Sequence, residues 1–143
     1  MTTSIERIHN DPRRYYEGTY HASGEWAVRI VLDVPDIPFS TSNPIVEGYV
    51  KNGTLYQGVK QIAPLDPCIK MVNHSPTGFA WGYQGSGPAQ LAFALLYHVT
   101  KDKETSQRFY QRFKADVIGA MPMEGNWKLS YNDIVEWLGE GAE

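Results

Sequence analysis

The stretch from residue 79 to residue 99 constrains the fold more than any other part of this chain. It opens with Phe79, Trp81 and Tyr83 at alternate positions, the period-two pattern of an extended strand. Gly85-Ser86-Gly87 follows, and glycine reaches backbone angles that other side chains forbid. The pattern predicts a strand that ends in a sharp glycine turn.

A helix is expected directly after this turn, over residues 88–99. Pro88 suits a first helical turn, where its missing N–H costs nothing. From Ala89 to Val99, only Gln90, Tyr97 and His98 carry polar side-chain atoms. A helix that is apolar on nearly every side is typically buried, so this one is predicted to be central. His98, near its end, is expected to be either a hydrogen-bonded core residue or a helix-end cation.

The first half of the chain has the patterns of strands. Residues 13–20 fit a short strand, and residues 26–34 alternate strictly, which predicts one face on a core and one partly open face. Arg29 lies in the middle of the open face. Three prolines predict a surface loop over 35–44, and residues 69–72 fit an additional edge strand.

Residues 45–62 are predicted to form a β-hairpin. Asn52-Gly53 at its centre is the strongest short hairpin signal, because both residues tolerate positive φ. Gly48 and Gly58 in the two arms predict a bulge. The hairpin is expected to project from the body of the protein.

Helical patterns dominate the second half. Residues 103–118 carry aromatic and aliphatic side chains at a spacing of four, and Gly119 fits the helix end. Ser130 and Asp133 form a capping box ahead of a short third helix, after which residues 139–143 are expected to be loose.

These elements predict an α+β fold in a single domain, 1–143, that is strand-rich over 13–84 and helical over 88–138. An antiparallel sheet would be covered on one face by two main helices and a short C-terminal helix. The predicted core comprises Trp26, Val28, Ile30, Leu91, Leu95, Phe109, Phe113, Val117, Ile134 and Trp137.

Composition excludes several classes of function. A formal net charge of −3 argues against a general nucleic-acid binder, which is usually strongly basic. Cys68 is the only cysteine and the four histidines lack metal-ligand spacing, so neither a metal nor a cofactor is indicated. The N-terminal residues do not resemble a signal peptide and no apolar stretch is long enough to span a membrane, so we expect a cytoplasmic protein.

The run Phe79-x-Trp81-Gly82-Tyr83-x-Gly85-Ser86-Gly87-Pro88-Ala89-Gln90-Leu91-Ala92 resembles the signature of a small uncharacterised domain family of bacterial, archaeal and phage proteins. The resemblance covers roughly residues 79–138 and implies a phage or mobile-element origin, but no activity. By this resemblance, the hairpin at 45–62 would be an elaboration specific to this chain.

The glycine turn matches no nucleotide-binding or nucleophile motif. Pro88 and Ala89 stand where a phosphate loop needs Lys and Ser or Thr, and Gln90 stands where a dinucleotide fingerprint needs its third glycine. Two interpretations remain open. Free N–H groups at a helix start can hold an anion, beside aromatic rings that stack on bases. Alternatively, the glycines only permit a tight turn and the aromatics belong to the core.

The first interpretation gives a candidate ligand site. Its residues are Trp81, Tyr83, Gly85, Ser86 and Gly87, with phosphate partners among Arg29, Arg108 and Arg112, because guanidinium groups pair well with phosphate. Arg108 and Arg112 share one edge of a helix at a spacing of four.

Three functions follow from these observations. The first is a non-enzymatic binding protein for a small anionic, nucleotide-like ligand, such as a phage-encoded protein that sequesters a host immune signalling molecule. The second is a protein-interaction module or inhibitor of a host enzyme, acting through the hairpin and its Tyr49 and Tyr56. The third is an enzyme of unrecognised type. The sequence leaves open whether the protein forms a homo-oligomer.

Overall fold

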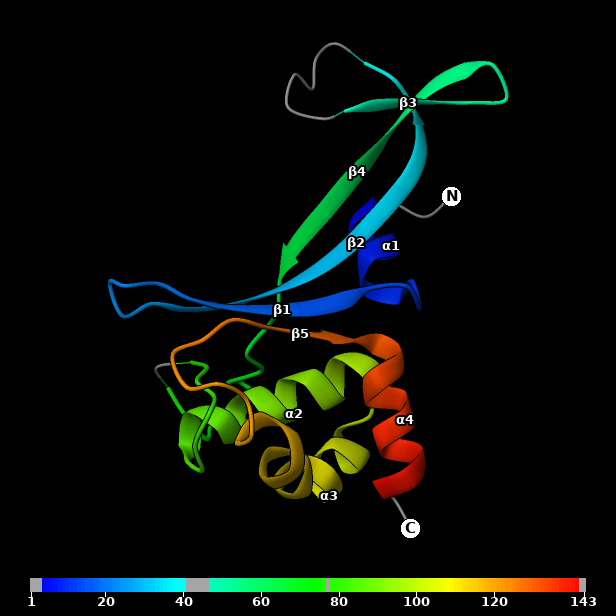
Figure 1. Ribbon diagram of the computed structural model, residues 1–143. Helices are drawn as coiled ribbons and strands as arrows, with labels where there is room; N and C mark the ends of the chain where they lie inside the picture. Colours follow the sequence, from blue (N-terminus) through cyan, green and yellow to red (C-terminus); the bar gives the residue numbers. More distant parts are fainter. Residues whose placement is uncertain (1–3, 41–46, 77, 142–143) are drawn as a thin grey trace.

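The computed structural model describes residues 4–40, 47–76 and 78–141 of the chain (Figure 1). Within these ranges the chain forms five strands, four α-helices and one π-helical segment. In chain order they are α1 (Ser4–Asn10), β1 (Tyr15–Tyr20), β2 (Trp26–Pro38), β3 (Gly48–Lys51), β4 (Thr54–Pro64), α2 (Ser86–Thr100), α3 (Lys103–Phe113), η1 (Lys114–Ile118), β5 (Trp127–Ser130) and α4 (Tyr131–Gly141).

The five strands form one sheet in the order β3-β4-β2-β1-β5, and every neighbouring pair is antiparallel. Its inner face carries alternate β2 residues such as Val28, Ile30 and Leu32, which pack with Leu91 of α2 and Phe113 of α3. Figure 1 shows α2, α3 and α4 gathered beneath this part of the sheet. The α+β fold predicted from the sequence is therefore confirmed, with an antiparallel sheet and helices on one face.

Strand β2 is longer than its sequence indicates, because the predicted loop over 35–44 begins as a strand. β2 continues through Pro38 and pairs with β4 on both sides of a register shift between Val34 and Ile37. Asp36 within this bulge has a φ of +58°. Bulges bend and twist a strand, and here the bend leads the sheet away from the helices (Figure 1). Residues 41–46 of the predicted loop lie outside the described residues.

The hairpin is confirmed over its described residues, and it turns at Asn52-Gly53. Their φ values of +52° and +79° are both positive, which is the geometry of the turn that best matches strand twist. Both arms pair in continuous register from Lys51↔Thr54 back to Gly48↔Gln57. The predicted bulge therefore lies in β2 and not in the hairpin arms. The hairpin projects from the body as expected (Figure 1).

The helices agree with their predicted positions but differ at their ends. α2 begins at Ser86, two residues earlier than predicted, because Gly85 serves as its N-cap. Pro88 still falls within the first turn. The second predicted helix is α3 followed by η1, in which the Gly119 N–H donates to the Lys114 carbonyl five residues earlier.

The predicted capping box at the start of the last helix is present. The Asp133 N–H donates to Ser130 Oγ at 2.9 Å, and the Ser130 N–H donates to Asp133 Oδ2 at 3.0 Å. The helix is longer than expected, since α4 continues to Gly141 and takes in residues that were predicted to be loose.

Two predicted strands are wrong, and two elements were not anticipated. The segment before α2 is not a strand: residues 78–81 are irregular and residues 82–85 form a bend. Gly82 has a φ of +83°, and its N–H donates to the Ile118 carbonyl instead of a strand partner. Residues 69–71 form a turn. The fifth strand is supplied by the short β5, and α1 covers part of β2 and β4.

The predicted core is largely correct. Six of its ten residues are fully buried, and the other four are partly buried against the same cluster. The partly buried four are Trp26, Phe109, Val117 and Trp137.

Candidate functional site

The glycine turn at the start of α2 is shaped by close packing. A Cβ on Gly87 would lie 2.7 Å from the Ala80 Cβ, and one on Gly82 would lie 2.5 Å from the Met123 Cα. A Cβ on Gly85 would lie 2.6 Å from an atom of the Tyr83 ring. Each glycine thus accommodates a neighbour that a larger residue would displace, which is what the tight-turn interpretation requires.

Trp81 is fully buried and lies within a cluster of aromatic rings. Its ring contacts Trp26 and Trp127 edge-on, with centroids at 4.6 and 5.6 Å. Its indole N–H donates to the Gly125 carbonyl at 2.9 Å. The ring is fully enclosed and its N–H is bonded, so Trp81 is not available for stacking on a ligand. Tyr83 is 40% exposed.

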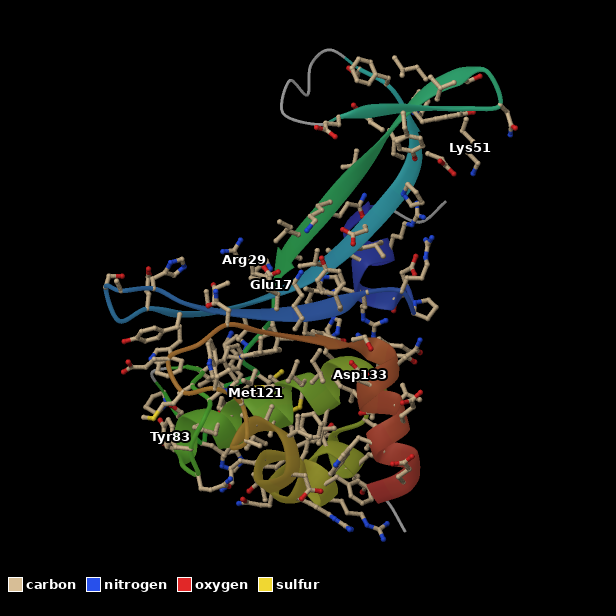
Figure 2. The ribbon with its side chains drawn as sticks, viewed as in Figure 1. Glu17, Arg29, Lys51, Tyr83, Met121 and Asp133 are labelled. Atoms are coloured by element: carbon tan, nitrogen blue, oxygen red, sulfur yellow. The ribbon has the colours of Figure 1, made fainter. Side chains whose placement is uncertain are left out.

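The structure does not bring Arg29 to the glycine turn. Arg29 alternates with Val28 and Ile30, which face the helices, so its side chain lies on the outer face of the sheet. Figure 2 shows Arg29 and Glu17 on that face, while Tyr83 lies on the helical side.

The two arginines of α3 are exposed and make local contacts. The Arg108 guanidinium lies 5.2 Å from the centroid of the Phe109 ring. Arg112 Nε lies 4.0 Å from Asp116 Oδ2. Of the ligand site predicted around Ser86, the backbone of the glycine turn and Tyr83 lie together as expected. Trp81 is enclosed in the core, and Arg29 lies on the other face of the sheet.

A partly buried chain of hydrogen bonds joins α1, β1 and the end of α2. Arg14 Nε donates to the Tyr16 hydroxyl at 3.1 Å, and that hydroxyl lies 2.7 Å from His98 Nδ1. His98 Nε2 in turn lies 2.9 Å from His9 Nδ1. Because arginine can only donate, the Tyr16 hydroxyl accepts from Arg14, and the tautomers of His98 and His9 set the direction of the two bonds to the imidazole rings.

Electrostatics keep this chain neutral at its histidines. Burial, with smaller contributions from the nearby Lys101 and Arg14 charges, lowers the pKa of His98 to about 3. The pKa of His9 is lowered by the same causes. His98 is therefore the hydrogen-bonded core residue among the two alternatives, and not a cation.

The far end of the hairpin carries exposed apolar side chains on the sheet face that continues the core. Phe39, Val50 and Leu55 are 37%, 71% and 46% exposed. A Cβ on Gly48 would lie 2.8 Å from the Phe39 ring and 3.2 Å from Leu55 Cδ1, and Val50 pairs directly with Leu55. The three side chains therefore lie together, and we call them the tip face. The interaction residues predicted from the sequence, Tyr49 and Tyr56, lie on the opposite face of the hairpin.

A family model for a family of unknown function, DUF6166, matches residues 47–140 of the chain. The chain belongs to this family. The DUF6166 match takes in β3, β4 and the tip-face residues Val50 and Leu55, so the hairpin is not an elaboration specific to this chain. β1 and β2, which complete the sheet, lie before the matched range. No curated protein and no solved structure matches the chain.

Two further observations describe the DUF6166 protein. Among the described residues, no group of three or more His, Cys, Asp or Glu side chains is placed to hold a metal ion. Over the same ranges, none of the helices combines the length and apolar character needed to cross a bilayer.

Proposed function

We propose that the protein is a non-enzymatic interaction module that binds a partner protein through the tip face of its hairpin. The observation that supports this proposal most directly is the exposure of Phe39, Val50 and Leu55 together on one side of a sheet that extends beyond its helices.

Single exposed apolar side chains are normal on protein surfaces and need no explanation. The tip face differs because Phe39 and Leu55 meet over Gly48 and Val50 pairs with Leu55, on a surface of three neighbouring strands. Contiguous exposed apolar surface of this kind is typical of interaction sites. The Phe39 N–H donates to the Leu55 carbonyl at 3.2 Å, so the backbone beneath the patch is held in register and the patch is preformed.

The expected partner presents an apolar surface that packs onto this face. The charged groups of the same region are directed elsewhere, since Lys51 Nζ lies 2.9 Å from Asp36 Oδ2 and the Tyr49 hydroxyl donates to Asp36 Oδ1 at 2.7 Å. Tyr49 and Lys51 alternate with Val50, so this network occupies the opposite face. The tip face can therefore be dehydrated without burying those charges.

An affinity-capture experiment with matched variants tests the proposal. Leu55→Asp places a charge on the tip face, and Ile62→Asp places the same charge at a 54% exposed position on the opposite face of the same strand. We expect one or more proteins to be captured by the wild type and by Ile62→Asp, and to bind Leu55→Asp at least about tenfold more weakly, which corresponds to about 1.4 kcal/mol.

Two results would contradict the proposal. One is an identical set of captured proteins for the wild type and Leu55→Asp. The other is a wild-type homodimer in solution that Leu55→Asp converts to a monomer, because a second copy of the chain would then occupy the face. Thermal unfolding of both variants checks that neither charge disturbs the fold.

A further inference from the structure

A cleft lies on the outer face of the sheet, where β2 bends. Its volume is about 550 Å³, within the range of sites that bind small molecules. The cleft arises at the bulge, where Gly58 alone lies opposite two β2 residues, Pro35 and Asp36, and contributes no side chain. It is lined by Arg13, Asp33, Val34, Pro35, Tyr49, Gly58, Val59 and Lys60.

The aromatic wall of the cleft is held in place. Tyr49 is 38% exposed, and its hydroxyl accepts the Asp36 N–H at 2.6 Å while donating to the Asp36 carboxylate at 2.7 Å. Asp36 itself is fixed by the bulge. The ring is therefore pre-oriented, which lowers the entropic cost of stacking a planar ligand against it.

Two cations line the same cleft. Arg13 is anchored by Asp11, which accepts from its Nε at 3.0 Å and from its Nη2 at 2.8 Å. A hydrogen bond with the Tyr15 hydroxyl raises the pKa of Lys60, so this ammonium group stays charged at neutral pH. Asp33 pairs with Lys60 in the sheet register and supplies a carboxylate acceptor at the same place.

We propose that this cleft binds a nucleoside monophosphate. The chemistry of the lining assigns each part of such a ligand: the heterocycle stacks on Tyr49, the phosphate lies between Arg13 and Lys60, and a ribose hydroxyl or exocyclic amine donates to Asp33. Pro35 provides an apolar part of the lining, while the Val34 side chain faces the core. The site is independent of the tip face, because Tyr49 and Leu55 lie on opposite faces of the hairpin.

Isothermal titration calorimetry with AMP, adenosine and inorganic phosphate tests this site. We expect saturable AMP binding with a Kd below about 1 mM, at least about tenfold tighter than either half of the molecule alone. The two halves distinguish a site for the complete ligand from a surface that attracts phosphate alone.

Gly58→Leu is the most informative variant. A Cβ at Gly58 has its nearest neighbour, the Val34 carbonyl oxygen, at 3.9 Å, so the backbone accepts a side chain that then fills the cleft. We expect this variant to fold normally and to lose AMP binding. Lys60→Met should weaken binding at least about tenfold, whereas Lys70→Met, at an exposed lysine outside the cleft, should leave it unchanged.

Three outcomes would overturn the assignment: no saturable binding of AMP, GMP, CMP or UMP; inorganic phosphate that binds as tightly as AMP; or AMP affinity that is unchanged in a folded Gly58→Leu protein. Leu55→Asp should bind AMP like the wild type, so failure of the ligand site and failure of the proposed partner site are separable.

Discussion

Exchanging one methyl group between Ala80 and Gly87 tests whether the glycine turn is a packing feature. The two residues meet where the segment before α2 crosses the first turn of that helix, and both are buried. In Gly87→Ala, the new Cβ would lie 2.7 Å from the Ala80 Cβ, well inside the separation of about 3.5–4.0 Å at which carbon atoms attract. The Ala80 Cβ cannot rotate away, so backbone must move.

The size of the effect follows from two opposing terms. Overpacking a filled core costs about 1–3 kcal/mol, while replacing glycine by alanine within a helix returns about 0.5–1 kcal/mol. We expect a net loss of about 1–2 kcal/mol. For a chain of this length, this is a fall in Tm of about 2–8 °C.

The double variant Ala80→Gly, Gly87→Ala distinguishes packing from other causes. Ala80→Gly alone should destabilise the protein by about 1–2 kcal/mol, through the lost buried methyl group and the added chain entropy. In the pair, the methyl group added at residue 87 occupies the space vacated at residue 80. The pair should therefore be more stable than the sum of the single effects by at least about 0.5 kcal/mol, measured by urea unfolding.

Additive effects, or a Gly87→Ala protein as stable as the wild type, would refute this reasoning. The first result would mean that the two positions do not share a contact. The second would mean that the turn is loose enough to serve as an open ligand site.

Other predictions concern the hydrogen-bonded chain through Tyr16 and the core. Tyr16→Phe removes the hydroxyl between Arg14 and His98, and urea unfolding should show a loss of about 1–3 kcal/mol; an unchanged midpoint would mean that water replaces the hydroxyl. Because the pKa of His98 falls from 6.5 to about 3 on folding, the unfolded chain binds a proton first as the pH falls. Stability should therefore decline from pH 6.5 toward pH 3, and His98→Gln should flatten the upper part of this decline, between about pH 6.5 and 4.5. Phe113→Ala removes a ring that is 1% exposed and packed on Trp137, and it should cost about 3–5 kcal/mol; a loss under about 1 kcal/mol would contradict its burial.

Local signals explain which parts of the fold could be predicted. The alternation over 26–34, the Asn52-Gly53 turn and the Ser130 capping box each depend on neighbouring residues, and each formed as expected. The four-residue strand β5 has no comparable signal. It forms because β1 offers it a free edge, from Tyr15↔Ser130 to Gly18↔Trp127.

The wrong strand before α2 has a physical reason. Phe79, Trp81 and Tyr83 alternate as they would in a strand, but Gly82 has a positive φ and no neighbouring strand accepts the segment. Trp81 is buried by other aromatic rings and Tyr83 is left partly exposed. Periodicity alone does not distinguish this arrangement from a strand.

The candidate sites depended on long-range geometry that the sequence does not specify. The tip face requires Phe39, from the end of an extended β2, to meet Leu55 of the hairpin, and the sequence predicted a loop at residue 39. The cleft requires the bulge at Asp36 opposite Gly58. A glycine in the hairpin arm was the only local indication of that irregularity.

Site-specific photo-crosslinking inside the cells that produce this protein tests the central claim most directly. A photoreactive amino acid at Val50, the most exposed residue of the tip face, is compared with the same group at Ile62 on the opposite face. Mass spectrometry then identifies any crosslinked protein. The proposed function predicts a discrete adduct with another protein from position 50 and none from position 62. Equal adducts from both positions, or adducts only between copies of this chain, would contradict it.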